Sequence, residues 1–167
     1  CDVIARLLEK EGVENYMILI GGEVVVKGVN QNGVCWRTGI NLPEDDPDGI
    51  KNNYDEIVQL CKKGAIATSG NYRNFYIKDG KKYAHTIDPR TGYPAEQSVL
   101  SATIVANDCM TADAYATAFM AMGLEKARQM ADSLPEIEYY VIYADENGKH
   151  QIEYSKGMLQ YLPKRKQ

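Results

Sequence analysis

Several short segments rich in β-branched and aromatic residues are joined by glycine-containing turns, and this pattern constrains the fold more than any other feature. The segment YMILI (16–20) is separated from EVVVKGV (23–29) by two glycines. Glycine reaches positive φ without a steric penalty, so such turns join adjacent antiparallel strands. Three further turns are NQNG, KDGK and ENGK, and we expect the first to close a hairpin onto VCWRTGI (34–40). The pattern predicts a mainly antiparallel or mixed sheet built from hairpins, with YMILI as a buried strand.

Three segments have the apolar spacing of helices rather than of strands. The first, DVIARLLEKEG (2–12), ends at a glycine that provides a left-handed stop. The second, TADAYATAFMAMG (111–123), is rich in alanine and follows Asn107 or Asp108 as its cap. The third, LEKARQMADSL (124–134), continues helically until the next proline. We therefore expect about three helices.

The remaining segments complete an α+β fold in one domain. Strand-forming residues recur in EIVQLCK (56–62), AIAT (65–68) and VLSATIVA (99–106). Proline, glycine and acidic residues concentrate in NLPEDDPDGIKNN (41–53), which we interpret as a surface loop. Because helices and strands do not alternate regularly, a doubly wound parallel sheet is not expected. A length of 167 residues suits a single domain over residues 1–167.

The composition is that of an ordinary globular domain. Hydrophobic residues make up 44% and charged residues 25% of the chain, and no apolar run reaches the roughly 18 residues that a bilayer requires. The net charge is −4, so no basic surplus indicates nucleic acid as a partner. We expect neither a nucleic-acid complex nor a membrane-spanning segment.

The cysteines are dispersed and give no motif. They stand at positions 1, 35, 61 and 109, without a close pair or a histidine at ligand spacing. This spacing indicates neither a zinc site nor a redox motif, and it does not force a disulfide. Because the chain opens on Cys1 rather than on methionine, we expect that processing or design has removed an upstream segment. A lipid on Cys1 is the alternative, but a helical pattern follows it without a flexible tether.

Two glycine-containing turns are candidate binding sites. Gly21 and Gly22 expose successive peptide groups ahead of Glu23 and could cradle a ligand, although a tight hairpin explains the same residues. Ser69-Gly70 leaves a probable strand and can present backbone N–H groups to an anion. An ordinary loop explains that pair equally well.

The segment HTIDPRTGYP contains one of only two histidines in the chain. His85 could move protons near neutral pH, Arg90 could pair with a phosphate, and Thr91-Gly92 could close the turn beneath it. Asp88 precedes a proline, which disfavours the helical conformation there. The alternative is an Asp-Pro turn held by an Asx hydrogen bond, which needs no ligand.

Asp113 and Thr117 stand at i and i+4 of the alanine-rich helix, so their oxygens can point at one spot. Magnesium takes few protein oxygens and completes its shell with water and substrate phosphates, which suits this sparse pair better than calcium does. The alternative is structural: the aspartate complements the helix dipole and the threonine bonds back to a backbone carbonyl.

In this order, the stretches GGEVVVKG, WRTGI, AIATSGNYRNFY, HTIDPRTGYP and TADAYATA resemble the ApbE family, the FAD:protein FMN transferases. The resemblance extends over essentially the whole chain, and the last two stretches are its most diagnostic part. The tripeptide Asn71-Tyr72-Arg73 departs from the Asp followed by Tyr-Glu of many relatives, which puts a carboxylate role there in doubt. The resemblance implies that the chain is the C-terminal half of such an enzyme, with an ApbE-like α+β fold.

The resemblance also implies an activity: Mg²⁺-dependent transfer of FMN from FAD to a Ser or Thr hydroxyl of an acceptor flavoprotein, with release of AMP. It implies a periplasmic or cell-envelope lipoprotein, anchored through the absent N-terminus. A pyrophosphatase that splits FAD into FMN and AMP, and a flavin-binding module without turnover, are the alternatives. The residues that the resemblance assigns are His85 for the transfer step, Asp113 and Thr117 for the metal, and Gly21, Gly22, Glu23, Ser69, Gly70, Asp88, Arg90, Thr91 and Gly92 for the flavin-nucleotide pocket.

Overall fold

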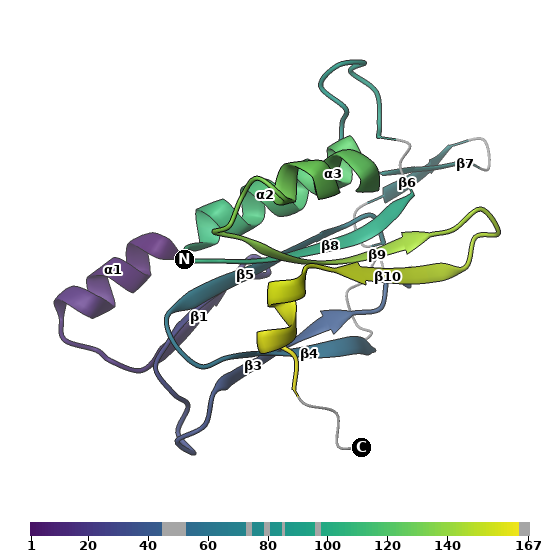
Figure 1. The fold of residues 1–167 in the computed structure, drawn as a ribbon. Helices are drawn as coiled ribbons and strands as arrows, with labels where there is room; N and C mark the ends of the chain where they lie inside the picture. Colours follow the sequence, from purple (N-terminus) through teal and green to yellow (C-terminus); the bar gives the residue numbers. More distant parts are fainter. Residues whose placement is uncertain (45–52, 73–74, 79–80, 85, 96–97, 164–167) are drawn as a thin grey trace.

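A six-stranded antiparallel sheet forms the middle of the protein (Figure 1). The computed structural model describes residues 1–44, 53–72, 75–78, 81–84, 86–95 and 98–163. The strand order is β1-β2-β5-β8-β9-β10. The strands are β1 (Tyr16–Ile20), β2 (Glu23–Lys27), β5 (Gly64–Gly70), β8 (Val99–Ala106), β9 (Glu138–Ala144) and β10 (His150–Tyr154).

Helices cover one face of this sheet (Figure 1). They are α1 (Asp2–Lys10), α2 (Cys109–Met122) and α3 (Leu124–Ala131). On α2, Ala112 and Ala116 are fully buried, so small side chains let this helix lie close to β5 and β8. This close approach sets where the exposed side chains of α2 stand relative to the end of β5.

The opposite face of the sheet is covered by a separate hairpin, β3 (Trp36–Asn41) with β4 (Tyr54–Leu60). Ile40, Val58 and Leu60 of this pair pack in one buried cluster with residues of β2, β5, β8 and β9. A short 3-10 helix, η1 (Lys156–Gln160), contributes Met158 to the same cluster. The central strands are therefore buried on both faces, which explains their continuous apolar character.

A smaller hairpin of β6 (Phe75–Lys78) and β7 (Lys81–Ala84) stands apart from the main sheet (Figure 1). It leads toward a turn that is closed by a bridge between Ile87 and Pro94. In the described part of the chain, no helix is long and apolar enough to cross a membrane.

The start of α2 is held by two carboxylates. Asp108 is the N-cap, and its side chain accepts a 2.8 Å hydrogen bond from the backbone N–H of Thr111. Asp2 of α1 accepts 2.9 Å bonds from the backbone N–H groups of Cys109 and Met110. These bonds satisfy amide groups that a helix leaves unpaired at its first turn, and they tie α1 to α2.

The sequence analysis is confirmed in its main points. The fold is α+β with antiparallel sheets and three α-helices in the described residues. The first helix is followed by Gly12 at positive φ, Asp108 caps the second, and the ENGK turn joins β9 to β10. Strands also occupy the expected segments before and after the second turn, KDGK, and at 99–106.

Three expectations were wrong in detail. NQNG connects β2 to β3 along the chain but does not close a hairpin between them, because β1 and β5 already pair with both edges of β2, and β3 pairs with β4 instead. YMILI is not fully buried: it is an edge strand, and Leu19 and Ile20 are 63% and 47% exposed. The third helix ends at Ala131, before the expected proline. Of the expected loop 41–53, residues 45–52 lie outside the described residues.

The cysteine spacing gave no signal for the bond that the structure contains. Cys35 and Cys61 form a disulfide across a sequence separation of 26 residues. Since Trp36 pairs with Leu60 in the β3–β4 register, the two cysteines are the next facing pair beyond that ladder. Register between two strands, rather than spacing along the chain, determines this bond. Cys1 and Cys109 carry free thiols.

Candidate functional site

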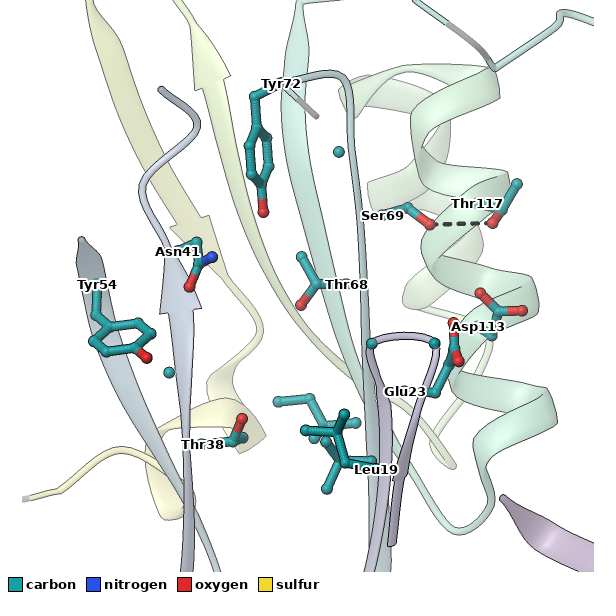
Figure 2. Close-up of a pocket in the computed structure, with 16 residues that line it drawn as sticks. Leu19, Glu23, Thr38, Asn41, Tyr54, Thr68, Ser69, Tyr72, Asp113 and Thr117 are labelled. Carbon is teal, nitrogen blue, oxygen red and sulfur yellow. Dashed lines mark hydrogen bonds between the residues drawn. The ribbon is translucent and has the colours of Figure 1, made fainter. Parts of the chain in front are cut away.

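A cavity of about 520 Å³ lies where the β1–β2 turn, the end of β5, α2 and the β3–β4 hairpin come together (Figure 2). Its size is in the range of small-molecule sites. One side carries Glu23, Ser69, Asp113 and Thr117, and the other carries Thr38, Asn41 and Tyr54. The complete lining is Leu19, Gly21, Gly22, Glu23, Val24, Thr38, Gly39, Asn41, Tyr54, Ile66, Thr68, Ser69, Gly70, Tyr72, Asp113 and Thr117.

The edge of β5 is open at this cavity. β2 pairs with β5 only from Gly64 to Ile66, because the chain turns back at Gly21-Gly22, whereas β8 pairs with β5 as far as Gly70. Beyond Ile66, no other described strand pairs with the β2-facing edge. Residues 68–70 therefore line the cavity along a strand edge without a described partner strand, where a ligand can replace the missing strand.

The two glycines of the first turn are needed for its conformation and for its place in the cavity. Gly21 and Gly22 have φ of 71° and 112°, which side-chain-bearing residues rarely adopt. A methyl group on Gly21 would also lie 2.8 Å from the Glu23 Oε2 atom. Both interpretations of this turn hold at once: it is a tight hairpin, and it lines the cavity together with Glu23.

Ser69 and Thr117 bring β5 and α2 into contact at the cavity wall. Their hydroxyl oxygens are 3.1 Å apart and form a hydrogen bond. The structural alternative for Thr117 was a bond back to its own helix, but its hydroxyl bonds to Ser69 on the neighbouring strand. A hydroxyl can donate this bond and still offer a lone pair to another partner.

Asp113 lies on the cavity-facing side of α2, one turn before Thr117 (Figure 2). It is outside the first helical turn, where the capping carboxylates are Asp108 and Asp2, so it is not needed to complement the dipole. Its carboxylate and that of Glu23 are drawn toward the same part of the cavity in Figure 2. This arrangement favours a ligand role for Asp113 over the structural alternative.

The oxygen atoms at this wall fit a magnesium ion. Among the described residues, no group of three or more His, Cys, Asp and Glu side chains forms a metal cluster. Magnesium does not require one, because it keeps several waters and binds through one or two carboxylates and substrate phosphates. Asp113 and Thr117 would supply a carboxylate and a hydroxyl, with Glu23 close to them.

The segment 86–95 forms a turn that satisfies its own polar groups. Arg90 donates to both oxygens of Asp88, from Nε at 3.0 Å and from Nη2 at 2.7 Å, and its backbone N–H donates to Oδ1 at 2.9 Å. This hydrogen bonding to Arg90 lowers the pKa of Asp88 to about 2. The Asx turn, which the sequence analysis gave as the alternative to a ligand site, is therefore present. The Arg90 guanidinium is paired with the Asp88 carboxylate.

The structure brings together some of the expected site residues and not others. Asp88, Arg90, Thr91 and Gly92 are not among the residues that line the cavity. His85 lies outside the described residues, so its role stays a prediction. The expected residues that share the cavity are Gly21, Gly22, Glu23, Ser69, Gly70, Asp113 and Thr117.

Comparison with known proteins identifies the chain. Residues 1–141 match the model of the ApbE family. This chain belongs to the ApbE family. The resemblance in the glycine turns, the Asp-Pro segment and the alanine-rich helix is therefore confirmed.

The ApbE relatives with curated names are called FAD:protein FMN transferases. The protein of that name from Vibrio cholerae is 45% identical over 132 residues, which are 79% of this chain and 38% of the relative. The one from Escherichia coli K12 is 40% identical over 129 residues, 77% of this chain and 35% of the relative. The chain thus spans well under half the length of these curated relatives.

Solved ApbE structures share the fold. The flavin transferase ApbE from Vibrio cholerae superposes with a TM-score of 0.81 at 39% identity, covering 96% of this chain and 48% of that one. The ApbE protein from Thermotoga maritima gives a TM-score of 0.73 at 31% identity, covering 90% of this chain and 45% of that one. The α+β architecture is therefore that of the ApbE family.

Sequence reasoning missed the wall contributed by β3 and β4. Thr38 and Asn41 of β3 and Tyr54 of β4 line the cavity, but none belongs to a motif with recognisable chemistry. Tyr72 was noted only as a departure from the family pattern, and it is buried at 7% exposure beside Gly70. The signals were the alternation of the two strands and the family resemblance of WRTGI, which contains Thr38, but neither reveals the face on which a separate hairpin packs.

Proposed function

We propose that this chain takes part in the transfer of FMN from FAD to a Ser or Thr hydroxyl of an acceptor protein, with release of AMP and dependence on Mg²⁺. One observation supports this most: three segments far apart in sequence, at 21–23, 69–70 and 113–117, meet at one cavity that offers carboxylates, hydroxyls and an open strand edge. The names of the relatives support the coarser part of this proposal, the transfer of FMN from FAD to a protein.

The reaction breaks the phosphoanhydride bond of FAD and forms a phosphoester bond to the acceptor. The acceptor hydroxyl oxygen bonds to the phosphorus of the FMN half, the bond from that phosphorus to the bridging oxygen breaks, and AMP leaves with the bridging oxygen. The hydroxyl proton must pass to a base. On the family resemblance we assign this step to His85, for which general base catalysis would contribute on the order of 10²–10⁴-fold.

The metal would be held at the α2 wall by Asp113 and Thr117. Bound there, Mg²⁺ would neutralise the charge that develops on the leaving phosphate and help to orient the diphosphate. The hydrogen bond between Ser69 and Thr117 keeps the Thr117 side chain in one orientation, and the fully buried Ala112 and Ala116 keep α2 close to β5. These residues fix the position of the ligand oxygens before the substrate arrives.

The dinucleotide would lie along the uncovered edge of β5. There the backbone of residues 68–70, which no described strand pairs on the β2 side, and the peptide groups of Gly21 and Gly22 would offer hydrogen bonds to the ligand. A cavity of about 520 Å³ would enclose part of FAD and leave the reacting phosphate accessible to an acceptor protein.

We further propose a periplasmic or cell-envelope location, with anchoring through a lipid on the full-length protein. The Cys35–Cys61 disulfide supports an oxidising compartment, because protein disulfides persist there and are rare in a reducing cytosol.

The test is to incubate the full-length protein with FAD, Mg²⁺ and a Ser/Thr-containing acceptor. Flavin covalently attached to the acceptor, with one AMP released per flavin, is the expected result. Free FMN with AMP, and no labelled acceptor, would replace the transferase by a pyrophosphatase. Binding of FAD without AMP release would leave a flavin-binding module.

A further inference from the structure

The aromatic ring of Tyr54 lies flat against a glycine at the wall of the cavity. Tyr54 of β4 faces Asn41 in the register of the hairpin, and its ring lies over Gly39 on β3. A methyl group built on Gly39 would overlap three atoms of the ring, Cγ, Cδ1 and Cε1. One face of the ring is therefore in contact with backbone, and this contact restricts its orientation.

The rest of the Tyr54 ring is open to the cavity. The residue is 51% exposed and lines the cavity opposite the carboxylate and hydroxyl wall (Figure 2). A second tyrosine, Tyr72, lies over Gly70 in the same way, but it is buried at 7% exposure. Of these two glycine-backed rings, Tyr54 is the one that has a surface free for a ligand to contact.

An exposed, oriented aromatic face inside a polar cavity suits a planar heterocycle. Stacking of a nucleobase on an aromatic side chain contributes about 1–3 kcal/mol and tolerates different ring systems, because each has a π-face. The phosphates of a dinucleotide would be drawn to the opposite wall, where the metal ligands Asp113 and Thr117 stand. The two walls therefore match the two chemical parts of such a ligand, charged phosphate and flat ring.

We propose that Tyr54 is a specificity-determining residue that stacks on a planar ring of the flavin dinucleotide, and that Gly39 positions it. This inference rests on the proposed function, since it names how the same cavity recognises its substrate. A tyrosine that merely shields the backbone of Gly39 would show the same packing but would not contact ligand, and the experiment below separates the two roles.

The experiment measures binding of FAD, FMN and AMP to the full-length protein by calorimetry in the presence of Mg²⁺. We expect Tyr54→Leu to weaken FAD binding between about 5-fold and 150-fold, the range that corresponds to loss of one stacked ring. Tyr54→Phe and Tyr54→Trp keep a π-face and should bind FAD nearly as the wild type does. Tyr154→Leu is the matched control, because Tyr154 is an exposed tyrosine on β10 and lies outside the cavity.

Gly39→Ala tests the positioning role without removing the ring. The added methyl group would displace the ring, so FAD binding should fall although Tyr54 is intact. Thermal unfolding of each variant shows whether the hairpin still folds. If FMN binding falls with Tyr54→Leu and AMP binding does not, the stacked ring is the isoalloxazine; the reverse identifies adenine.

Transfer assays distinguish a failure of this inference from a failure of the proposed function. At saturating FAD, Tyr54→Leu should transfer flavin at close to the wild-type kcat with a raised KM. If the wild type transfers flavin and Tyr54→Leu binds FAD, FMN and AMP as tightly as the wild type, the role of Tyr54 is refuted and the function stands. If the wild type neither binds FAD nor releases AMP, both are refuted.

Discussion

The two walls of the cavity are built in different ways. The wall of α2 and β5 belongs to the main sheet and its helix layer, and its polar side chains are supported by fully buried alanines. The wall of β3 and β4 is a separate two-stranded sheet, closed at one end by the Cys35–Cys61 disulfide. In the function proposed above, the helix-backed wall would hold the groups for chemistry, whereas the separate hairpin would hold the group that recognises the ring.

Removal of the carboxylate at the α2 wall should have the largest effect. We expect Asp113→Ala to reduce the rate of AMP release on the order of 10²–10³-fold, because a metal ion supplies several kcal/mol of charge stabilisation in the transition state. FMN, which lacks the diphosphate, should bind with little change. Asp132→Ala, at an exposed aspartate on the C-cap of α3, is the matched control. AMP release at the wild-type rate from Asp113→Ala would remove the metal role from this wall.

The disulfide tests the other wall. Replacement of Cys35 and Cys61 together by serine should lower the free energy of unfolding by about 3 kcal/mol, the chain-entropy expectation for a loop of this length. It should also raise the KM for FAD more than it lowers kcat, because β3 and β4 carry the ring-binding residue proposed above. Urea unfolding with and without reductant measures the loss of stability. Reductant should lower the unfolding midpoint of the wild type and leave that of the double variant unchanged.

The control for this double variant is Cys1→Ser, which removes a free thiol and should keep the response to reductant. If reductant leaves the unfolding midpoint of the wild type unchanged, the bond does not stabilise the hairpin.

A smaller effect is expected at the contact between β5 and α2 in the cavity wall. Ser69→Ala removes the 3.1 Å hydrogen bond to Thr117, and a typical bond contributes about 1 kcal/mol. The Mg²⁺ concentration for half-maximal AMP release should therefore rise about 5-fold. Ser133→Ala, which removes a hydroxyl that donates to the carbonyl of Met130 on α3, should leave that concentration unchanged. An unaltered magnesium titration for Ser69→Ala would show that Thr117 needs no positioning.

The smallest effect is expected in the turn of residues 86–95, where Asp88 and Arg90 lie outside the cavity lining. The pKa of Asp88 is lowered to about 2 by Arg90, so the ionised carboxylate stabilises the fold above its unfolded pKa of about 4. This stabilisation is lost as the pH falls from about 4 to about 2. Arg90→Ala should be less stable than the wild type at pH 6, and the two melting temperatures should converge near pH 2. If the difference between the two melting temperatures stays constant from pH 6 to pH 2, the Asp88–Arg90 pair does not stabilise the fold in this way.

Local signals in the sequence predicted much of the fold and one wall of the site. The i and i+4 spacing of Asp113 and Thr117 placed both on one helix face, and the turn residues placed the β1–β2 and β9–β10 hairpins. These features depend on residues close together along the chain, where propensity and turn chemistry decide the structure.

Features that depend on long-range pairing could not be predicted. The choice of β4 rather than β2 as the partner of β3 follows from the strands that already border β2. The pairing of Cys35 with Cys61 follows from that choice, and so does the place of Tyr54 at the cavity. A single error in strand pairing therefore hides both the disulfide and the second wall.

The carboxylates at the start of α2 have a consequence for where an anion can bind. The amide groups of Cys109, Met110 and Thr111 already donate to Asp2 and Asp108, so the positive end of this helix is neutralised from within the protein. A phosphate cannot dock there as it does at many nucleotide-binding helices. In the proposed function the phosphate would instead approach the flank of the helix at Asp113, where the proposed cation would lie between the two negative groups.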